Sequence, residues 1–346
     1  MKSIRVLAAL AAAPMLLAAC GGSGGTSGGT GGSSCSKTFK VGLVTDVGKL
    51  SDKSFNATSW QGVLDAQNDK SLCVQGKAIE SNQPTDYQKN MQTFVDQGYD
   101  MVIAVGFLMG DDTLAAATKN PKVKFAIVDN SYDKPTDNLV GLVFREDQAG
   151  FLAGALAGMY TKTNTIGGVY GLDIPPVHKY RVGYENGAKY TNPKIKTIGV
   201  YQPAGPNAFN DPDWGKARGI EEIGQGADII FGAGGNTGNG ALLAAVQKNV
   251  TCVGVDVDQY NTVTDAQKCM ITSAEKKLAV AVKTAISNAS KGQFKSGVMT
   301  FDASNGGVGL APYHDFDSKV TADQRAKIAD ILKQLAAGTL KTGAEQ

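Results

Sequence analysis

Acidic residues at the ends of short apolar runs are the side chains in this sequence best placed to bind a ligand. Asp46, Asp129 and Asp256 each stand at or just after the end of such a run. A carboxylate is a strong acceptor for hydroxyl and ring N–H donors. In open α/β sheets, ligands bind outside the carboxyl ends of the strands. The pattern indicates a site that accepts hydrogen bonds, although Asp46 and Asp256 also fit a second role, capping the helix that follows.

Residues soon after the first of these aspartates supply the rest of one expected wall of the site. Phe55 stands between Ser54 and Asn56 in a polar loop, and Phe209 stands in a similar loop, AFNDP. Neither ring has an obvious core to fill there, so each is available to stack on a flat ligand. The alternative is that each ring packs against its own part of the fold. We expect Asp46, Ser54, Phe55 and Asn56 to share one wall.

Two glycines, Gly234 and Gly235, lie between an expected strand and an expected helix. The absence of side chains there lets a ligand reach backbone amides, although a tight turn would need the same glycines. A dinucleotide-binding pattern that starts at Gly232 would end at position 237, which is threonine. The dinucleotide fingerprint is therefore absent.

Apolar runs alternate with helical patterns along most of the chain. Continuous apolar strands are typical of parallel sheets that are covered on both faces. The alternation restarts after residue 165, and each set is about the size of one domain, so we expect an α/β protein with two similar lobes. The expected strands are 41–44, 73–80, 101–106, 125–128 and 139–144, then 166–170, 197–201, 228–231, 253–256 and 270–273, and the expected helices of the second set include 178–190 and 240–248.

The first 36 residues have the composition of a targeting segment and a spacer. Residues 1–19 begin with positive charge and continue with an apolar run too short to span a bilayer, which is typical of a secretory signal peptide. The residues before Cys20 resemble the lipobox of bacterial lipoproteins, whose cysteine is acylated; an ordinary signal peptide with a chance cysteine is the alternative. Residues 20–36 form a Gly/Ser-rich tether after that cysteine. We expect a lipid-anchored protein on the cell membrane that faces the periplasm or the cell exterior.

Composition argues against several classes of function. Residues 1–19 hold two of the 34 basic residues and none of the 32 acidic ones, which leaves 32 against 32. A chain without excess positive charge is not expected to bind nucleic acid. His178 and His314 are far apart and have no ligand spacing beside them, which argues against a zinc or histidine-based catalytic site. We expect no enzyme, cofactor or metal.

Four cysteines remain once Cys20 is assigned to lipid, and outside the cytoplasm an even set predicts disulfides. Cys35 and Cys73 precede the first two expected strands, while Cys252 and Cys269 lie in or beside two late strands. Four cysteines allow three connectivities. The placement favours Cys35 with Cys73 and Cys252 with Cys269, and free buried thiols are the alternative.

Several stretches together resemble one family, the basic membrane protein family of bacterial lipoproteins. They are VGLVTDVGKLSDKSFN, VDQGYDMVIAVGF, VKFAIVDN, FREDQAGFLAGALAG, FNDPDWGK, GADIIFGAGGNTG, GVDVDQ and GGVGLAP, and they follow in order from residue 39 to about residue 313. The resemblance implies a substrate-binding protein of an ABC importer, working with permease and ATPase subunits. Many members of the family bind purine nucleosides.

The resemblance also implies a type I periplasmic binding protein fold, in which Rossmann-like lobes are joined by a three-strand hinge. One lobe would comprise 37–143 plus 273–297 and the other 144–272 plus 298–346. The chain would then cross between the lobes near Phe144, Ile271 and Val298. We expect a monomer with the ligand held between the lobes.

The family positions imply a role for each candidate residue toward a purine nucleoside. Phe55 and Phe209 would sandwich the base, and Asp129 would meet the base edge, with Ser54 and Asn56 as lesser candidates. Ribose would be bound by Asp46, Asp256 and Lys276, with Gly234 and Gly235 offering backbone contacts; without the resemblance, a solvated surface role would be expected for that lysine.

Three other functions fit the same residues. One is binding of another flat ligand such as a flavin, because two phenylalanines and an aspartate do not specify a purine. A nucleoside-cleaving enzyme would use carboxylates at strand ends for acid–base work. A surface adhesin or sensor would share the anchor and the lobes without transport.

Overall fold

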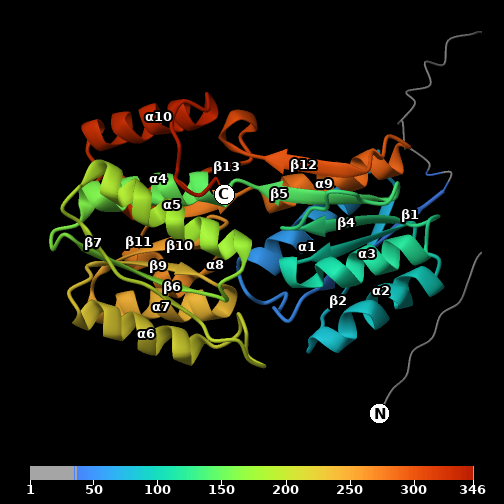
Figure 1. Ribbon diagram of the computed structural model, residues 1–346, viewed down its shortest axis with the longest axis horizontal. Helices are drawn as coiled ribbons and strands as arrows, with labels where there is room; N and C mark the ends of the chain where they lie inside the picture. Colours follow the sequence, from blue (N-terminus) through green and yellow to red (C-terminus); the bar gives the residue numbers. More distant parts are fainter. Residues whose placement is uncertain (1–34, 36, 346) are drawn as a thin grey trace, which may run out of the picture. The chain divides into compact units, whose positions relative to one another are not determined.

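The computed structural model describes residues 35 and 37–345, and the expected signal peptide, Cys20 and most of the tether lie outside the described residues. Within the described part, two open sheets are flanked by helices and lie in two lobes (Figure 1). The predicted α/β architecture with two parallel sheets is confirmed. No helix among the described residues is long and apolar enough to cross a bilayer.

The first lobe is built on a fully parallel sheet. All five residues of its inner strand β3 (Met101–Val105) are buried, as expected for a strand of a parallel sheet that is covered on both faces. Helices α1 and α9 pack against each other on one face, and α2 and α3 contribute to the core of the other. In spatial order the strands are β12 (Gly297–Phe301), β5 (Leu139–Phe144), β4 (Lys124–Val128), β3 (Met101–Val105), β1 (Phe39–Thr45) and β2 (Val74–Ile79). The helices are α1 (Phe55–Asn68), α2 (Tyr87–Asp96), α3 (Gly110–Lys119) and α9 (Leu278–Ser290).

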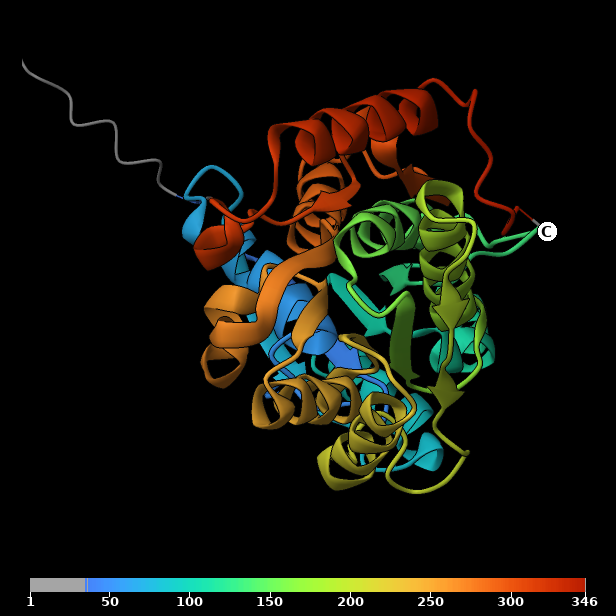
Figure 2. The ribbon, with the colours of Figure 1, turned by 90° about the vertical axis from the view of Figure 1, so that its left-hand side faces the viewer.

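The second lobe repeats the plan and adds an antiparallel edge strand. Its strands are β13 (Val308–Leu310), β11 (Met270–Lys276), β10 (Thr251–Asp256), β9 (Ile229–Ala233), β6 (Thr165–Tyr170) and β7 (Lys196–Thr197), with β8 (Val200–Tyr201) also paired to β6. Its helices are α4 (Glu146–Tyr160), α5 (Pro175–Thr191), α6 (Pro212–Gly224), α7 (Gly235–Lys248), α8 (Gln259–Thr262) and α10 (Ala322–Ala336). Figure 2 shows α10 lying over α4, which it contacts.

Helix α4 is buried almost throughout because its small residues allow close packing against α5. A Cβ at Gly154 would collide with the carbonyl oxygen of Tyr184, and one at Gly150 with that of Tyr180. The close approach fixes α5 against the lobe. It therefore fixes Tyr180, which points toward the cleft described below.

Three elements differ from the sequence prediction. The expected strand 197–201 is two short strands, interrupted at Ile198 and Gly199. Helix α5 starts at Pro175 because proline suits the first turn of a helix. Helix α7 starts at Gly235, five residues earlier than expected, and runs through GNTG; the close packing of Gly238 against Gly232 requires small residues there.

The sheets show where the chain passes between the lobes. It leaves the first sheet between Phe144 and Glu146, returns after Lys276 at the end of β11, and leaves again after Phe301 at the end of β12. The last two passages lie a few residues beyond the expected positions near Ile271 and Val298. For the passage after Lys276, the reason is that β11 ends in polar residues that are nevertheless buried, so its apolar pattern stops before the strand does.

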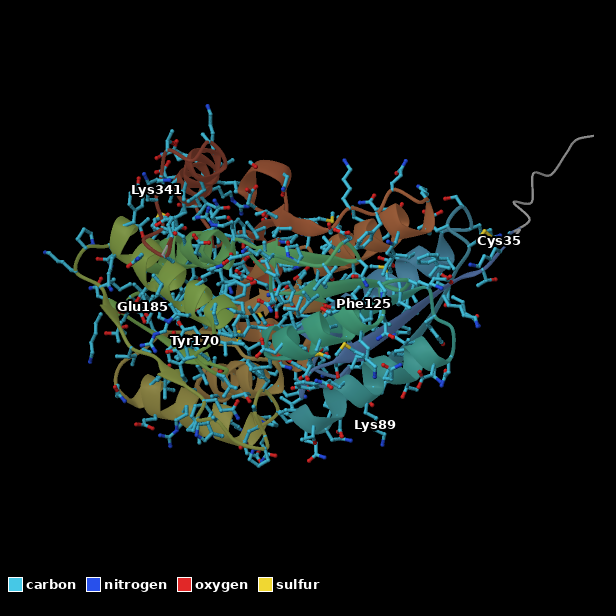
Figure 3. All side chains as sticks on the ribbon, turned by 45° about the vertical axis from the view of Figure 1, so that its right-hand side comes forward. Cys35, Lys89, Phe125, Tyr170, Glu185 and Lys341 are labelled. Carbon is cyan, nitrogen blue, oxygen red and sulfur yellow. A yellow bond between two sulfur atoms is a disulfide. The ribbon has the colours of Figure 1, made fainter. Side chains whose placement is uncertain are left out.

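Both favoured disulfides are present. Cys35 pairs with Cys73, which ties the start of the described chain to the beginning of β2, and Cys252 pairs with Cys269 between β10 and the turn before β11. Figure 3 shows Cys35 at the outer end of the first lobe, away from Tyr170 and Glu185 in the second. Short 3₁₀ helices complete the chain at Pro84–Asp86, Phe107–Met109, Thr264–Cys269, Ala303–Asn305 and His314–Phe316.

Candidate functional site

A cleft between the lobes gathers nearly all of the residues expected to bind ligand. It has about 580 Å³ of empty space, a figure that includes the part open to solvent. Nine of the ten candidates line it: Asp46, Phe55, Asn56, Asp129, Phe209, Gly234, Gly235, Asp256 and Lys276. The tenth, Ser54, is fully buried beside them, and its hydroxyl has no hydrogen-bond partner among the described residues.

Asp46 directly follows the last residue of β1 and lines the cleft from the first lobe. Its Oδ1 accepts a hydrogen bond from the Gly48 amide at 2.9 Å. A Cβ on Gly106, whose φ is +123°, would collide with the Asp46 carboxylate, so glycine is required at that position. Burial raises the pKa of Asp46 to about 7. Its carboxyl group can therefore be either an acceptor or a donor near neutral pH.

Lys276 is the charge at the centre of the cleft and is only 2% exposed. Its Nζ lies 2.6 Å from Asp129 Oδ2, 3.5 Å from Glu146 Oε1 and 3.8 Å from Asp256 Oδ1. Burial alone would lower the pKa of this lysine, but the three carboxylates together raise it above its ordinary value. Lys276 is thus a fixed cation that the chain's own carboxylates hold in place.

The acidic partners of Lys276 come from different parts of the fold. Asp129 follows β4 in the first lobe, Glu146 begins α4 at the first crossing, and Asp256 ends β10 in the second lobe. Burial raises the pKa of Glu146 to about 8 and that of Asp256 to about 7. Lys276 itself ends β11, where the chain passes back to the first lobe. The cluster therefore lies where the two lobes meet.

Aromatic rings surround the same ammonium group. The Lys276 Nζ lies 4.7 Å from the ring centroid of Phe55, 5.4 Å from that of Phe144 and 5.7 Å from that of Tyr180. These distances are in the range of cation–π attraction. The Tyr180 hydroxyl lies 3.3 Å from both Asp256 Oδ1 and the carbonyl oxygen of Ala274, and it can donate to one of them at a time.

Phe55 and Phe209 enter the cleft from opposite lobes. Phe55 is the first residue of α1. Phe209 has a positive φ of 60°. The backbone amide of Phe209 donates to Gln202 Oε1 at 2.8 Å, and this bond holds the loop in place. The ring of Phe209 packs so closely on Gly171 that a Cβ there would collide with it. Both rings are half-buried, so part of each faces the cleft.

The two glycines of the second lobe form the entrance to α7. A Cβ on Gly234 would collide with the amide of Gly171, and one on Gly235, whose φ is +56°, would lie 2.9 Å from the carbonyl oxygen of Phe209. The turn therefore needs glycine for its own geometry. The helix that starts there directs its positive N-terminal end at the cleft.

The sequence did not single out several residues that shape the cleft. The carboxylate of Asp52 accepts the amides of Ser54, Asn56 and Ala57 and so fixes the start of α1. An aspartate just before a helix is a recognisable capping signal, so Asp52 was detectable. Tyr180 lies inside the periodic pattern of a helix, and no sequence signal distinguishes it from a core residue.

The described lining of the cleft holds four aspartates, namely Asp46, Asp52, Asp129 and Asp256, against the single positive charge of Lys276. Apolar groups such as Phe107, Ile174 and Val177 cover the rest. A cleft lined in this way offers a ligand acidic groups that can accept or donate hydrogen bonds, one buried cation and apolar surface.

Comparisons with known proteins identify the family. Residues 39–338 match the family model described as Bmp, ABC transporter substrate-binding protein PnrA-like. The CD4+ T-cell-stimulating antigen of Listeria monocytogenes is 32% identical, over 97% of this chain and 96% of that protein. The ABC transporter nucleoside-binding protein BmpA of Lactococcus lactis subsp. cremoris is 31% identical, over 88% of this chain and 91% of that protein.

A solved structure supports the same fold. The ABC transporter solute-binding protein from Aeropyrum pernix K1 superimposes with a TM-score of 0.79 at 22% sequence identity, covering 88% of this chain and 92% of that one. The family model spans both sheets and the cleft between them. The chain therefore belongs to the Bmp family of PnrA-like ABC transporter substrate-binding proteins, a family of solute receptors and not of enzymes.

Proposed function

We propose that this protein captures a purine nucleoside in the cleft between its lobes. The observation that carries the proposal is the pair Phe55 and Phe209, which enter one cleft from opposite lobes beside carboxylates from both. Aromatic rings on two sides suit a flat base, and the carboxylates suit the hydroxyls of a ribose. The nucleoside-binding name of the Lactococcus lactis relative agrees with this assignment.

The base edge is assigned to Asp129. Its Oδ2 is engaged by Lys276 at 2.6 Å, while its buried Oδ1 lacks a hydrogen-bond partner among residues 35 and 37–345. Asn56 Oδ1 is in the same situation. Leaving buried acceptors unpaired is costly. A purine that presents ring and exocyclic N–H donors would supply the missing partners, and the buried Ser54 stays a lesser candidate.

The ribose is assigned to Asp46, Asp256 and Lys276. The two aspartates come from opposite lobes, so both can contact one sugar only when the lobes are closed. Gly234 and Gly235 keep the backbone of the second lobe close to the sugar. A phosphate on the sugar would meet a lining with an excess of carboxylates, so a nucleoside is favoured over a nucleotide.

The cellular setting follows from the family and from the sequence before the described residues. The receptor would deliver its ligand to the permease of an ABC importer whose ATPase drives transport. Cys20 would carry the lipid, and the tether of residues 20–36 would let a monomer reach the permease from the membrane surface.

Thermal shift and calorimetry on the purified protein test this assignment. Inosine, guanosine and adenosine should each be compared with ribose, riboflavin and adenosine monophosphate. We expect at least one nucleoside to raise the melting temperature and the other three compounds to have little effect. A rise with riboflavin or ribose alone would show that the nucleoside assignment is wrong. Chromatography for free base after incubation distinguishes capture from cleavage.

A further inference from the structure

Side chains of the second lobe donate hydrogen bonds to a loop of the first lobe, across the rim of the cleft. Asn239 on α7 donates from Nδ2 to the carbonyl oxygen of Asp52 at 2.8 Å. Thr262 at the end of α8 donates from Oγ1 to the carbonyl oxygen of Lys53 at 2.7 Å. Neither bond runs through the three chain crossings. Asn239 is 8% exposed, so its bond is shielded from water.

On the first lobe, this contact leads directly to the ligand wall. The carboxylate of Asp52 accepts the amides of Ser54 at 3.0 Å, Asn56 at 2.8 Å and Ala57 at 3.1 Å, and also Nδ2 of Asn56 at 3.2 Å. Asp52 is 2% exposed. These bonds fix the first turn of α1, which begins with Phe55 and Asn56. A displacement of the Asp52 loop would therefore move both residues.

On the second lobe, the contact leads to the opposite wall. Asn239 Oδ1 accepts from Gln259 Nε2 at 2.9 Å, and Gln259 Oε1 accepts from the amide of Val255 at 2.9 Å. The amide of Gln259 donates to Ser273 Oγ at 3.1 Å. Gln259 is fully buried. Val255 lines the cleft and directly precedes Asp256.

We propose that Asn239 is a positioning residue for solute capture. It completes a hydrogen-bonded bridge from Asn56 through Asp52, Asn239 and Gln259 to Val255, and this bridge couples the two walls of the cleft in the closed state. An amide suits the central place because it donates on one side and accepts on the other. When the lobes separate, the bond to Asp52 breaks, whereas the other links stay within one lobe.

The bridge stabilises closure whatever solute is bound. A single neutral hydrogen bond is worth about a fivefold to tenfold shift in an equilibrium. Loss of the Asn239 donor should shift the open–closed equilibrium by that factor and should appear mainly as faster release. Thr262 is more exposed than Asn239, so its bond should contribute less.

The test compares Asn239→Ala and Asn239→Asp with the unsubstituted protein. The aspartate keeps the shape of the side chain but has no donor at neutral pH. The first readout is the rate of inosine release in a stopped-flow experiment, and the choice of inosine rests on the proposed function. Release should be about fivefold to tenfold faster in both variants. The association rate should change little, because the ligand first meets the open protein. Asn239→Asp keeps the acceptor for Gln259 Nε2, so its melting temperature without ligand should fall less than that of Asn239→Ala, which leaves this buried donor unpaired.

A second readout does not depend on the ligand. Fluorescence energy transfer between labels at Gln61→Cys and Asp265→Cys, which are exposed positions on opposite lobes, measures the closed fraction in a Cys20→Ser background. We expect a smaller closed fraction in both Asn239 variants. Asn186→Ala is the matched control, because Asn186 donates to the Thr342 carbonyl within the second lobe at 2.8 Å; it should change neither readout.

The outcomes separate the bridge from the ligand assignment. If the closed fraction falls but the unsubstituted protein binds none of inosine, guanosine and adenosine, the bridge stands and the nucleoside proposal fails. Release at the unsubstituted rate together with an unchanged closed fraction would overturn the bridge. An equal effect from Asn186→Ala would also overturn it, because the side-chain amide of Asn186 donates within the second lobe.

Discussion

Replacing Lys276 by methionine tests the central charge of the cleft. Methionine keeps most of the side chain's volume and removes the ammonium group. In the structure that group lies 2.6 Å from Asp129, 3.5 Å from Glu146 and 3.8 Å from Asp256, and it is almost fully buried. Removing one partner of a buried ion pair leaves the remaining charge uncompensated.

The size of the effect follows from this geometry. Breaking a buried pair costs about 3–5 kcal/mol of unfolding free energy, which corresponds to a fall of about 5–8 °C in melting temperature for a chain of this length. The penalty should depend on pH. Without the lysine, the pKa of Glu146 and that of Asp256 rise further above their unfolded values, so keeping these groups buried costs more free energy at pH 8 than at pH 5. We therefore expect a large loss of stability at pH 8 and a smaller one at pH 5.

Thermal melting of the unliganded protein at both pH values is the assay. Lys277→Met is the matched control, because the neighbouring lysine pairs with Glu275 at 2.6 Å while 42% exposed. A surface pair of that kind contributes about 0–1 kcal/mol, so the control should melt within about 1–2 °C of the unsubstituted protein. If Lys276→Met were as stable as the control at pH 8, the account of the buried cluster would be refuted.

Three further expectations follow from the same structure. Phe55→Ala should weaken nucleoside binding by about 1–3 kcal/mol, the worth of one base–aromatic contact, with a small effect on melting; a large drop in unliganded melting temperature would instead place the ring in the core. Burial raises the pKa of Asp46 and of Asp256 to about 7, above the value of about 3.9 in the unfolded chain. Between these values the folded protein binds more protons than the unfolded chain, so the melting temperature without ligand should fall from pH 5 to pH 8. A rise would contradict the assigned burial. The double variant Cys252→Ser with Cys269→Ser lacks the disulfide that joins two residues 17 positions apart. Its free energy of unfolding, measured by urea titration, should be lower by about 3 kcal/mol. No change would mean that the bond is not formed in solution.

The sequence predicted the positions of the acidic residues well, for a simple physical reason. Asp46, Asp129 and Asp256 follow apolar strands, and parallel strands deliver their carboxyl ends to one edge of each sheet. The two phenylalanines were recognisable because large rings in polar loops lack a core of their own. All five line the cleft in the structure.

Other features depend on tertiary contacts that no local pattern carries. Glu146 and Lys276 are buried because they pair with residues distant in sequence, and the polar end of β11 therefore hid both the extent of that strand and the position of the crossing. Tyr180 has the spacing of an ordinary helix residue. Asn239 acquires its bridging contact only when two lobes meet across 187 residues of sequence separation.

Mass spectrometry of the small molecule that co-purifies with the protein tests the central claim most directly. The protein should be produced in cells, purified without added ligand and measured both under native conditions and after denaturation. We expect one purine nucleoside per chain in the native measurement and the same nucleoside, free and uncleaved, after denaturation. A sugar, a flavin or a nucleotide as the bound species would contradict the account.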